Sequence, residues 1–154
     1  MMKKKATMAK RTQKPYELFE HTADIGLRVF GKDSKELFVN AARGMFSVIA
    51  GSKKGQPRDL QGRPFFVEVS AANREELLVS WLSELLSLSD IHNIIFFQFQ
   101  IEQLTECSLK AGLNARELNS RGYERKTEIK AVTYHNLNIK TVNNTLQAEV
   151  IFDV

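Results

Sequence analysis

The chain has 154 residues, of which 43% are hydrophobic, and a formal net charge of +4. This length fits one domain with one sizeable core and excludes a second full domain. The sequence has no run of about 18 apolar residues, which argues against a membrane-spanning helix. Its lysine-rich start lacks the apolar segment of a secretory signal. We therefore expect a cytoplasmic protein without membrane contact. The lone Cys107 excludes an internal disulfide, and we expect it to be buried as a small apolar residue.

The positive charge is concentrated at the N-terminus. Residues 1–14 contain six basic residues and no acidic one, so the remaining 140 residues carry 16 basic and 18 acidic residues, a net charge of −2. We predict a basic, disordered and solvated tail over residues 1–14 and a single domain over residues 15–154. A tail that contacts RNA is the alternative, because clustered lysines also bind phosphates.

The first clear elements are a strand and a helix. Alternating apolar residues at 25–29 predict a strand that Gly31 ends. Asp33 or Ser34 then caps a helix, and Glu36 favours the positive end of its dipole. The buried stripe of this helix is predicted to be Leu37, Phe38, Ala41, Ala42, Met45, Phe46 and Ile49.

A loop and a second helix follow. Gly51 is a natural helix stop, and residues 51–64 are rich in glycine, proline and charge, which predicts a surface loop before a strand at 65–70. Asn73 and Glu76 form a capping-box pattern at the start of the second helix. Its core stripe is predicted to be Leu77, Leu78, Trp81, Leu82, Leu85 and Leu86.

The second half of the chain reads as four strands, at 94–101, 107–115, 127–139 and 145–154. Alternation is clearest in the last, where Leu146, Ala148, Val150 and Phe152 oppose Gln147, Glu149, Ile151 and Asp153. With two strands at the start, the order is β-β-α-β-α-β-β-β-β. We predict an α+β two-layer sandwich, a mostly antiparallel or mixed sheet with two main helices on one face.

The sequence lacks a glycine-rich phosphate loop, an HExxH helix and a serine nucleophile elbow. What remains is a set of polar groups beside apolar strands, namely His21, Asp24, Lys130, His135 and Asp153. Taken singly, Asp24 fits a turn residue, Lys130 a snorkelling edge residue and each histidine a satisfied, partly buried side chain.

Asp153 is more informative than the other four. It lies beside the C-terminal carboxylate of Val154, and two like charges held together need a cation or a base to neutralise them. Calcium and magnesium take oxygen ligands of this kind. If the turn at Asp24 meets the final strand, Asp24 completes an oxygen-rich cluster. Lys130 is expected on a strand face opposite Ile129, Ala131 and Thr133, where it balances negative charge or faces a phosphate.

Three separated stretches resemble the archease family: "YELFEHTADIGLRVFGKDSKELFVNAARGMF", "ELLVSWLSELL", and "EIKAVTYHNLNI" with "AEVIFDV". They occur in the expected order and span nearly everything from Tyr16 to Val154. Within them, three motifs agree in order and roughly in spacing: the HTAD stretch, the KAVTYH stretch and the carboxylate before the last residue. Agreement of these three motifs is more specific than any one of them.

The resemblance implies a function in RNA ligation. Archeases activate the RtcB-type ligase, which attaches GMP from GTP to its own histidine, and they promote this guanylylation and multiple turnover in tRNA splicing and RNA repair. The family's metal ligands fall on Asp24, Asp153 and Val154, its important lysine falls on Lys130, and His21 and His135 are supporting residues.

We therefore expect an RNA-ligase activator rather than an enzyme, with calcium or magnesium as its divalent metal. The chain offers no covalent nucleophile and no nucleotide loop of its own. Two alternatives stay open: a chaperone-like modulator of a tRNA-modifying enzyme such as a methyltransferase, and a metal-dependent phosphohydrolase that uses Asp24 and Asp153.

Overall fold

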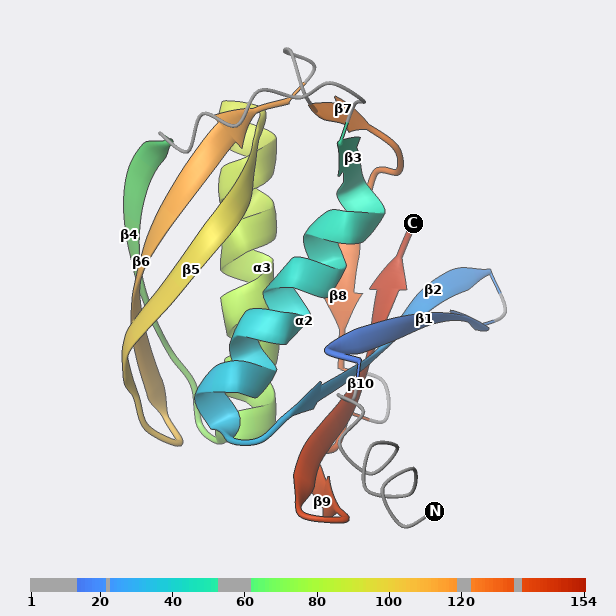
Figure 1. Ribbon diagram of the computed structural model, residues 1–154, viewed down its shortest axis with the longest axis vertical. Coiled ribbons are helices and arrows are strands. Elements are labelled where there is room, and N and C mark those ends of the chain that lie inside the picture. Colours follow the sequence, from blue (N-terminus) through green and yellow to red (C-terminus); the bar gives the residue numbers. More distant parts are fainter. Residues whose placement is uncertain (1–13, 22, 53–61, 119–122, 135–136) are drawn as a thin grey trace, which may run out of the picture.

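The computed structural model describes residues 14–21, 23–52, 62–118, 123–134 and 137–154 (Figure 1). Two helices and ten strands are assigned in these ranges. In chain order they are β1 (Tyr16–His21), β2 (Asp24–Gly31), α2 (Ser34–Ile49), β3 (Ala50–Ser52), β4 (Arg63–Ser70), α3 (Arg74–His92), β5 (Ile94–Leu104), β6 (Ser108–Glu117), β7 (Tyr123–Arg125), β8 (Ala131–Thr133), β9 (Lys140–Val142) and β10 (Thr145–Asp153).

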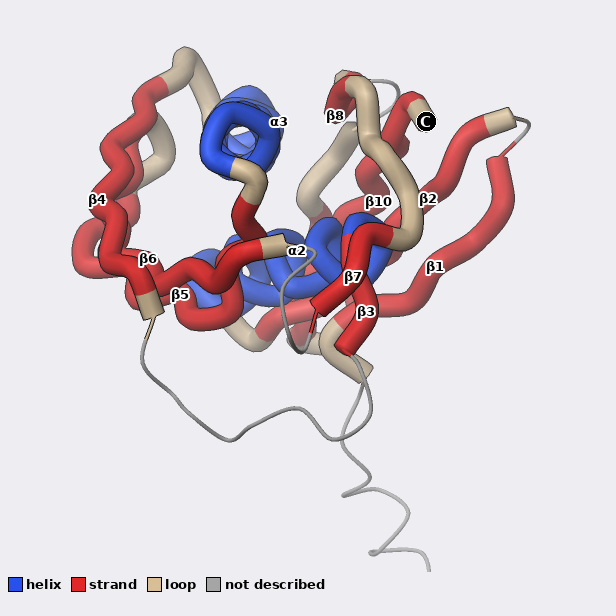
Figure 2. The backbone as a smooth tube through the Cα atoms, turned by 90° about the horizontal axis from the view of Figure 1, so that it is seen from above, coloured by secondary structure: helices blue, strands red, loops and turns tan. Residues whose placement is uncertain are grey.

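The described strands form three antiparallel sheets. One has five strands in the order β1-β2-β10-β8, with β9 also paired to β10; the others have the orders β4-β6-β5 and β3-β7. Both helices lie between the two larger sheets (Figures 1 and 2). The predicted α+β class, with two helices and antiparallel sheets, is confirmed. The structure adds that the strands divide among separate sheets, and that each larger sheet turns one face to the helices.

Both helices begin as their sequences predict. The Asp33 side chain accepts a hydrogen bond of 2.9 Å from the backbone N–H of Glu36, and the Asn73 side chain accepts one of 2.9 Å from that of Glu76. These bonds satisfy N–H groups that have no partner within the helix. The predicted stop at Gly51 is confirmed, because Ala50 is the C-cap of α2 and Gly51 is the first residue beyond it. Helix α2 ends at Ile49 and the chain continues directly as β3, because pairing with β7 takes up the backbone from Ala50 onward.

The core lies around the two helices. Every residue of both predicted stripes is buried, at 6% exposure or less. One hydrophobic cluster joins them to buried residues of both larger sheets. The indole N–H of Trp81 donates a 2.9 Å hydrogen bond to the backbone oxygen of Phe38, which ties α3 to α2 and satisfies the one polar atom of this fully buried ring. Neither of the two helices in the described ranges is long and apolar enough to span a membrane.

The structure corrects the prediction for residues 127–139. Among the described residues of this range, 127–134 and 137–139, only Ala131–Thr133 form a strand, β8. The separate short strands β7 and β9 were not predicted. Ile129 is buried while Ala131 is exposed, so the expected shared face of Ile129, Ala131 and Thr133 is wrong. The regular alternation begins only where β8 pairs with β10, because a strand's two faces are defined by the partner to which it is hydrogen bonded.

The prediction that Cys107 is buried is also wrong, because its side chain is exposed. It lies in the turn between β5 and β6, where the Thr105 hydroxyl accepts hydrogen bonds from the backbone N–H groups of Cys107 (3.2 Å) and Ser108 (3.0 Å). The turn holds this residue at the end of the sheet, where its carbonyl oxygen accepts a 2.9 Å hydrogen bond from the backbone N–H of Ala71, just before α3. The predicted surface loop over 51–64 is part strand, in β3 and β4, and its residues 53–61 lie outside the described residues.

Candidate functional site

Four of the predicted site residues, Asp24, Lys130, Asp153 and Val154, lie at one end of the five-stranded sheet. Asp24 is the first residue of β2, and its neighbour Ile25 pairs with Phe152 of β10. Asp153 follows Phe152 and pairs with Ala131 of β8. Extending the β2–β10 register by one residue sets Asp24 opposite Asp153. The start of β2, just after the first turn, therefore lies beside the end of β10 (Figure 1).

The two carboxylates share one face of the sheet. On β10, Ala148, Val150 and Phe152 are buried towards the helices, and on β2 Leu27 and Val29 are buried in the same cluster. Because side chains alternate between faces along a strand, Asp24 and Asp153 lie on the opposite face. Asp153 is exposed and Asp24 is half-buried. A pair of carboxylates on adjacent strands repel one another, so this arrangement favours a cation between them.

Lys130 is attached to the same end of the sheet through its backbone. Its N–H donates a 2.7 Å hydrogen bond to the carbonyl oxygen of Asp153. The residue precedes β8, and its side chain is exposed. The ammonium group is therefore carried beside the final residues of the chain without being part of the core. Val154, half-buried, follows Asp153 directly.

The structure describes the two predicted histidines, His21 and His135, only in part. The backbone of His21 ends β1 and pairs with Asp24, so His21 belongs to the same turn. Its side chain, and the whole of His135, lie outside the described residues.

The neighbouring row of side chains on this face is fully charged and was missed by sequence reasoning. Arg28 donates hydrogen bonds to Glu149 (2.8 Å) and to Glu17 (2.9 Å), which come from β10 and β1. The bond to Glu149, followed by that to Glu17, raises the pKa of the Arg28 guanidinium. Two glutamates against one arginine leave this row with one negative charge. It therefore does not offset the carboxylates of Asp24 and Asp153.

A glycine and an aromatic ring separate the two charged rows. The ring of Phe19 covers Gly26, where a Cβ atom would overlap it, and the guanidinium carbon of Arg28 lies 4.9 Å from the centre of the same ring. A glycine inside a strand signals such a close approach. The signal was in the sequence, but the ring that uses the space belongs to another strand, and its identity depends on the β1–β2 register.

The chemistry of this end of the sheet is that of an exposed carboxylate cluster with one lysine. In the ranges that the structure describes, no group of three histidine, cysteine, aspartate or glutamate side chains is arranged to hold a metal ion. Asp24 and Asp153 supply two such side chains, and the sequence-based prediction adds the carboxylate of Val154 as a third oxygen ligand. The set consists of oxygen atoms alone, which suits calcium or magnesium better than zinc.

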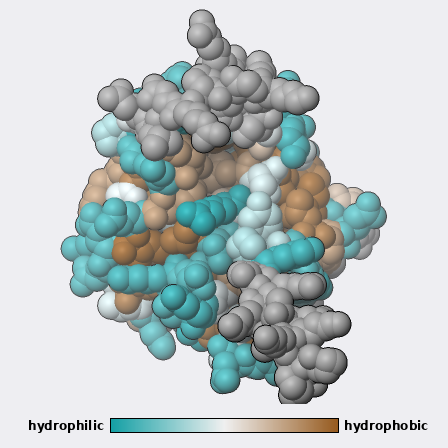
Figure 3. Space-filling view, in the orientation of Figure 1, coloured by the Kyte–Doolittle hydropathy of each residue, from teal (hydrophilic) through white to brown (hydrophobic). Residues whose placement is uncertain are grey.

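The surface around the cluster is open. In the orientation of Figure 1, hydrophilic side chains cover much of the visible face, with hydrophobic areas between them (Figure 3). Leu18 on β1 is 49% exposed, and Tyr134, directly after β8, is 58% exposed. Because Leu18 pairs with the core residue Leu27, it lies on the helix-side face of the sheet, opposite to Asp24 and Asp153.

Fold and site together define a small α+β domain with charged groups at an open sheet end. The sequence and structure comparisons then give the family. Residues 16–154 match the model of the Archease protein family, and the chain belongs to this family.

Curated relatives agree with this assignment over nearly the whole chain. The protein archease of Methanosarcina acetivorans is 37% identical over 145 residues, which cover 92% of this chain and 97% of the relative. That of Thermococcus kodakarensis is 38% identical over 128 residues, which cover 81% of this chain and 87% of the relative.

Two solved structures share the fold. The solution structure of protein 1598 from Methanobacterium thermoautotrophicum matches with a TM-score of 0.69 and 32% identity, covering 92% of this chain and 100% of that one. The crystal structure of an archease from Thermotoga maritima, described as a possible chaperone, matches with a TM-score of 0.61 and 23% identity, covering 94% and 98%. The second likeness concerns the fold alone.

Proposed function

We propose that this chain activates an RtcB-type RNA ligase in the cytoplasm by promoting guanylylation of the ligase histidine. Membership of the archease family supports the proposal, together with one structural observation. The register of β2 and β10 brings Asp24 next to Asp153, and Lys130 is hydrogen bonded to the backbone of Asp153, at an exposed end of the molecule. Groups placed in this way can be presented to the active site of another protein.

The reaction being assisted is a phosphoryl-type transfer. A ligase histidine nitrogen forms a bond to the α-phosphorus of GTP, and the bond from that phosphorus to the pyrophosphate group breaks. Negative charge grows on the departing oxygen atoms, so cationic groups and correct alignment lower the barrier. The exposed ammonium group of Lys130 would serve this purpose on the nucleotide, while the main chain of Asp153 fixes where the lysine is carried.

The carboxylates would hold a divalent cation, calcium or magnesium. Asp24, Asp153 and the Val154 terminus fit such an ion because all are hard oxygen donors on neighbouring positions of one sheet end. When bound, the ion would add positive charge and an orienting contact for phosphate oxygens. Arg28 keeps Glu17 and Glu149 engaged nearby, so those carboxylates do not compete for the ion.

In this proposal the protein is a cofactor of the ligase rather than an enzyme. The test is a guanylylation assay of the cognate ligase with GTP, with and without this protein. We expect the protein to increase the fraction of guanylylated ligase and the number of turnovers. RNA or nucleotide hydrolysis by the protein alone with divalent metal would contradict the proposal and favour the phosphohydrolase.

A chaperone-like role towards a tRNA-modifying enzyme is the second candidate. The description of the Thermotoga protein as a possible chaperone and the exposed Leu18 and Tyr134 favour it. The two candidates differ in their need for the carboxylates. If Asp24→Asn still suppresses aggregation of a methyltransferase but a Leu18→Ser, Tyr134→Ser variant does not, the chaperone role has its own surface.

A further inference from the structure

A cluster of positive side chains forms where β2 leads into α2, at the opposite end of β2 from Asp24. Lys14, Lys32 and Arg43 line one hollow of about 400 Å³ there, together with a single acidic residue, Glu36. All four of these side chains are on exposed residues. The acid is partly engaged, since Glu36 Oε1 accepts a 2.7 Å hydrogen bond from the Lys32 backbone N–H. The lining therefore carries three positive charges against one negative charge.

The fold, rather than a run of lysines, produces this cluster. Lys14 precedes β1, Lys32 follows β2 and Arg43 projects from α2. The backbone N–H of Phe30 donates a 2.9 Å hydrogen bond to the Pro15 oxygen, which holds the segment just before β1 beside the end of β2. Residues 15–154 together have a net charge of −2. The excess of positive charge in this hollow therefore does not come from an overall positive charge of the domain.

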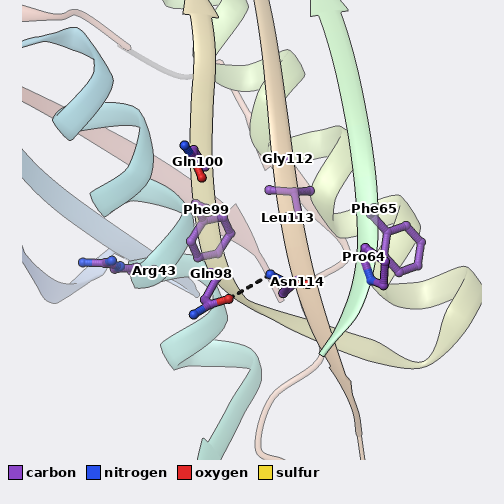
Figure 4. Close-up of a pocket in the computed structure, with 9 residues that line it drawn as sticks. All are labelled: Arg43, Pro64, Phe65, Gln98, Phe99, Gln100, Gly112, Leu113 and Asn114. Atoms are coloured by element: carbon purple, nitrogen blue, oxygen red, sulfur yellow. Dashed lines mark hydrogen bonds between the residues drawn. The ribbon is translucent and has the colours of Figure 1, made fainter. Parts of the chain in front are cut away.

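Arg43 also lines a second hollow, of about 500 Å³, beside the three-stranded sheet. Figure 4 shows its polar lining on neighbouring strands: Gln98 and Gln100 on β5, and Asn114 on β6. The Asn114 amide donates a 2.8 Å hydrogen bond to Gln98 Oε1, which leaves further amide donors and acceptors for a ligand. Because both hollows contain Arg43, a cationic surface continues into an amide-lined one.

We propose that this joined surface, the Arg43 groove, binds single-stranded RNA. Lys14, Lys32 and Arg43 contact backbone phosphates, and the amides of Gln98, Gln100 and Asn114 contact ribose hydroxyls and base edges. Each nucleotide of an RNA strand carries a phosphate, a ribose hydroxyl and a base, so a strand can occupy the cationic hollow and the amide-lined hollow together. A single small anion would occupy only the cationic hollow. The sequence leading into Lys14 adds five basic residues and no acid.

The Arg43 groove is separate from the carboxylate cluster. Seven residue steps along β2 separate Asp24 from Gly31, and at about 3.3 Å per step this places the groove roughly 23 Å from that cluster. The inference goes beyond the proposed activation of the ligase. It can be tested without a ligase and with Asp24, Lys130 and Asp153 intact, so failure of one proposal is distinguishable from failure of the other.

The test measures fluorescence anisotropy of a labelled, unstructured RNA of about 20 nucleotides with the full chain. The groove variant is Lys32→Gln with Arg43→Gln. The matched control, Lys110→Gln with Arg125→Gln, removes the same charge from β6 and β7 at two residues that line neither hollow. We expect the groove variant to bind about tenfold more weakly at low salt. Its slope of log affinity against log salt should fall by about 1.4, because about 0.7 is lost per single-strand phosphate contact. The control should stay within about twofold of wild type.

Three results would overturn the proposal. Equal weakening in both variants would mean that the N-terminal lysines or general charge carry binding. Displacement of RNA by inorganic phosphate, beyond the effect of sodium chloride at the same ionic strength, would mark a small-anion site. Wild-type RNA affinity in the groove variant, with lost stimulation of the ligase, would assign the Arg43 groove to an acidic protein surface. Thermal melting of each variant checks that the fold is kept.

Discussion

Asp24 and Asp153 reach one sheet end from opposite ends of the chain, and their roles can be separated by small substitutions. A turn residue needs hydrogen-bonding capacity, whereas a metal ligand in an oxygen cluster needs negative charge. Asn keeps the first and removes the second. An Asp→Asn substitution at this end of the sheet therefore distinguishes a turn residue, which tolerates it, from a metal ligand, which does not.

The substitution Asp24→Asn should leave the fold intact and abolish stimulation of ligase guanylylation at saturating metal. Asparagine keeps the size of the side chain and its position opposite Asp153, but not its charge. The measurement is guanylylation of the cognate ligase alongside a thermal melt. His21→Gln, in the same turn, is the comparison and should lose less activity, because we expect His21 to brace the turn. Full stimulation by Asp24→Asn would leave the turn with a structural role only.

Lys130→Ala should remove ligase activation while leaving the stability of the protein nearly unchanged. The side chain is exposed, and the hydrogen bond to Asp153 comes from the backbone, so alanine retains it. We expect the free energy of unfolding to change by no more than about 0.5 kcal/mol while ligase activation is lost. Denaturant unfolding and the guanylylation assay check this. A fall in melting temperature of about ten degrees would instead mark Lys130 as a structural residue.

Strand β2, which carries Asp24, is joined to helix α2 by a close contact between their backbones. Gly31 ends β2, and a Cβ atom there would overlap the backbone of Leu37 in the first turn of α2. Strand and helix are therefore in contact where the chain turns from one to the other. The buried Asn40 strengthens the same junction, since its side-chain amide donates a 2.8 Å hydrogen bond to the Phe30 oxygen.

Gly31→Ala should destabilise the protein by about 1–3 kcal/mol, because backbone atoms of α2 must move to make room for one methyl group. Gly112→Ala is the matched control. A Cβ atom there would meet only Glu102 Oε2 at 3.6 Å, an ordinary contact, so we expect a change within about 0.5 kcal/mol. Urea unfolding of both variants gives the comparison. Equal stability of the two would show that the β2–α2 junction has room to relax.

Across the whole molecule, the charges are divided between two regions. Carboxylates collect at the Asp24 end of the five-stranded sheet, and cations collect in the Arg43 groove at the other end of β2. The first region suits a divalent ion and the second suits phosphates. If both proposals hold, this separation would let one small protein contact an enzyme and a nucleic acid without the two charge patterns cancelling.

Calcium or magnesium should bind with a stoichiometry of one, and at a hundred times its dissociation constant should stabilise the folded state by about 2.7 kcal/mol. Calorimetry and thermal melting with and without a chelator measure both effects. Asp24→Ala with Asp153→Ala should abolish them. Glu68→Ala with Glu102→Ala removes the same number of charges from the three-stranded sheet and should not. Equal ion binding by the two double variants would refute the assignment.

Local interactions made much of the fold predictable from sequence. The caps at Asp33 and Asn73 and the two helix stripes depend on residues three or four apart, which any helix brings together. Alternation in β10 likewise predicts which residues enter the core, and Ala148, Val150 and Phe152 do. The family resemblance rested on motifs that can be read in order along the chain.

Predictions failed where a residue's surroundings come from distant strands. The loop predicted from Gly51 begins as a strand, because β7 pairs with β3. The described part of residues 127–139 forms only the short β8, and Cys107 is exposed in a turn. Each outcome depends on competition between partners that the local sequence does not contain.

The sequence by itself determined the two helices, the last strand, the family and the identity of the candidate carboxylates and lysine. Only the tertiary structure decided that Asp24 lies opposite Asp153, that Arg28 occupies Glu17 and Glu149, and that Lys14, Lys32 and Arg43 share one hollow. The physical reason is that strand pairing joins residues at any separation in the chain. Its register is set by the packing of the whole core rather than by neighbouring residues.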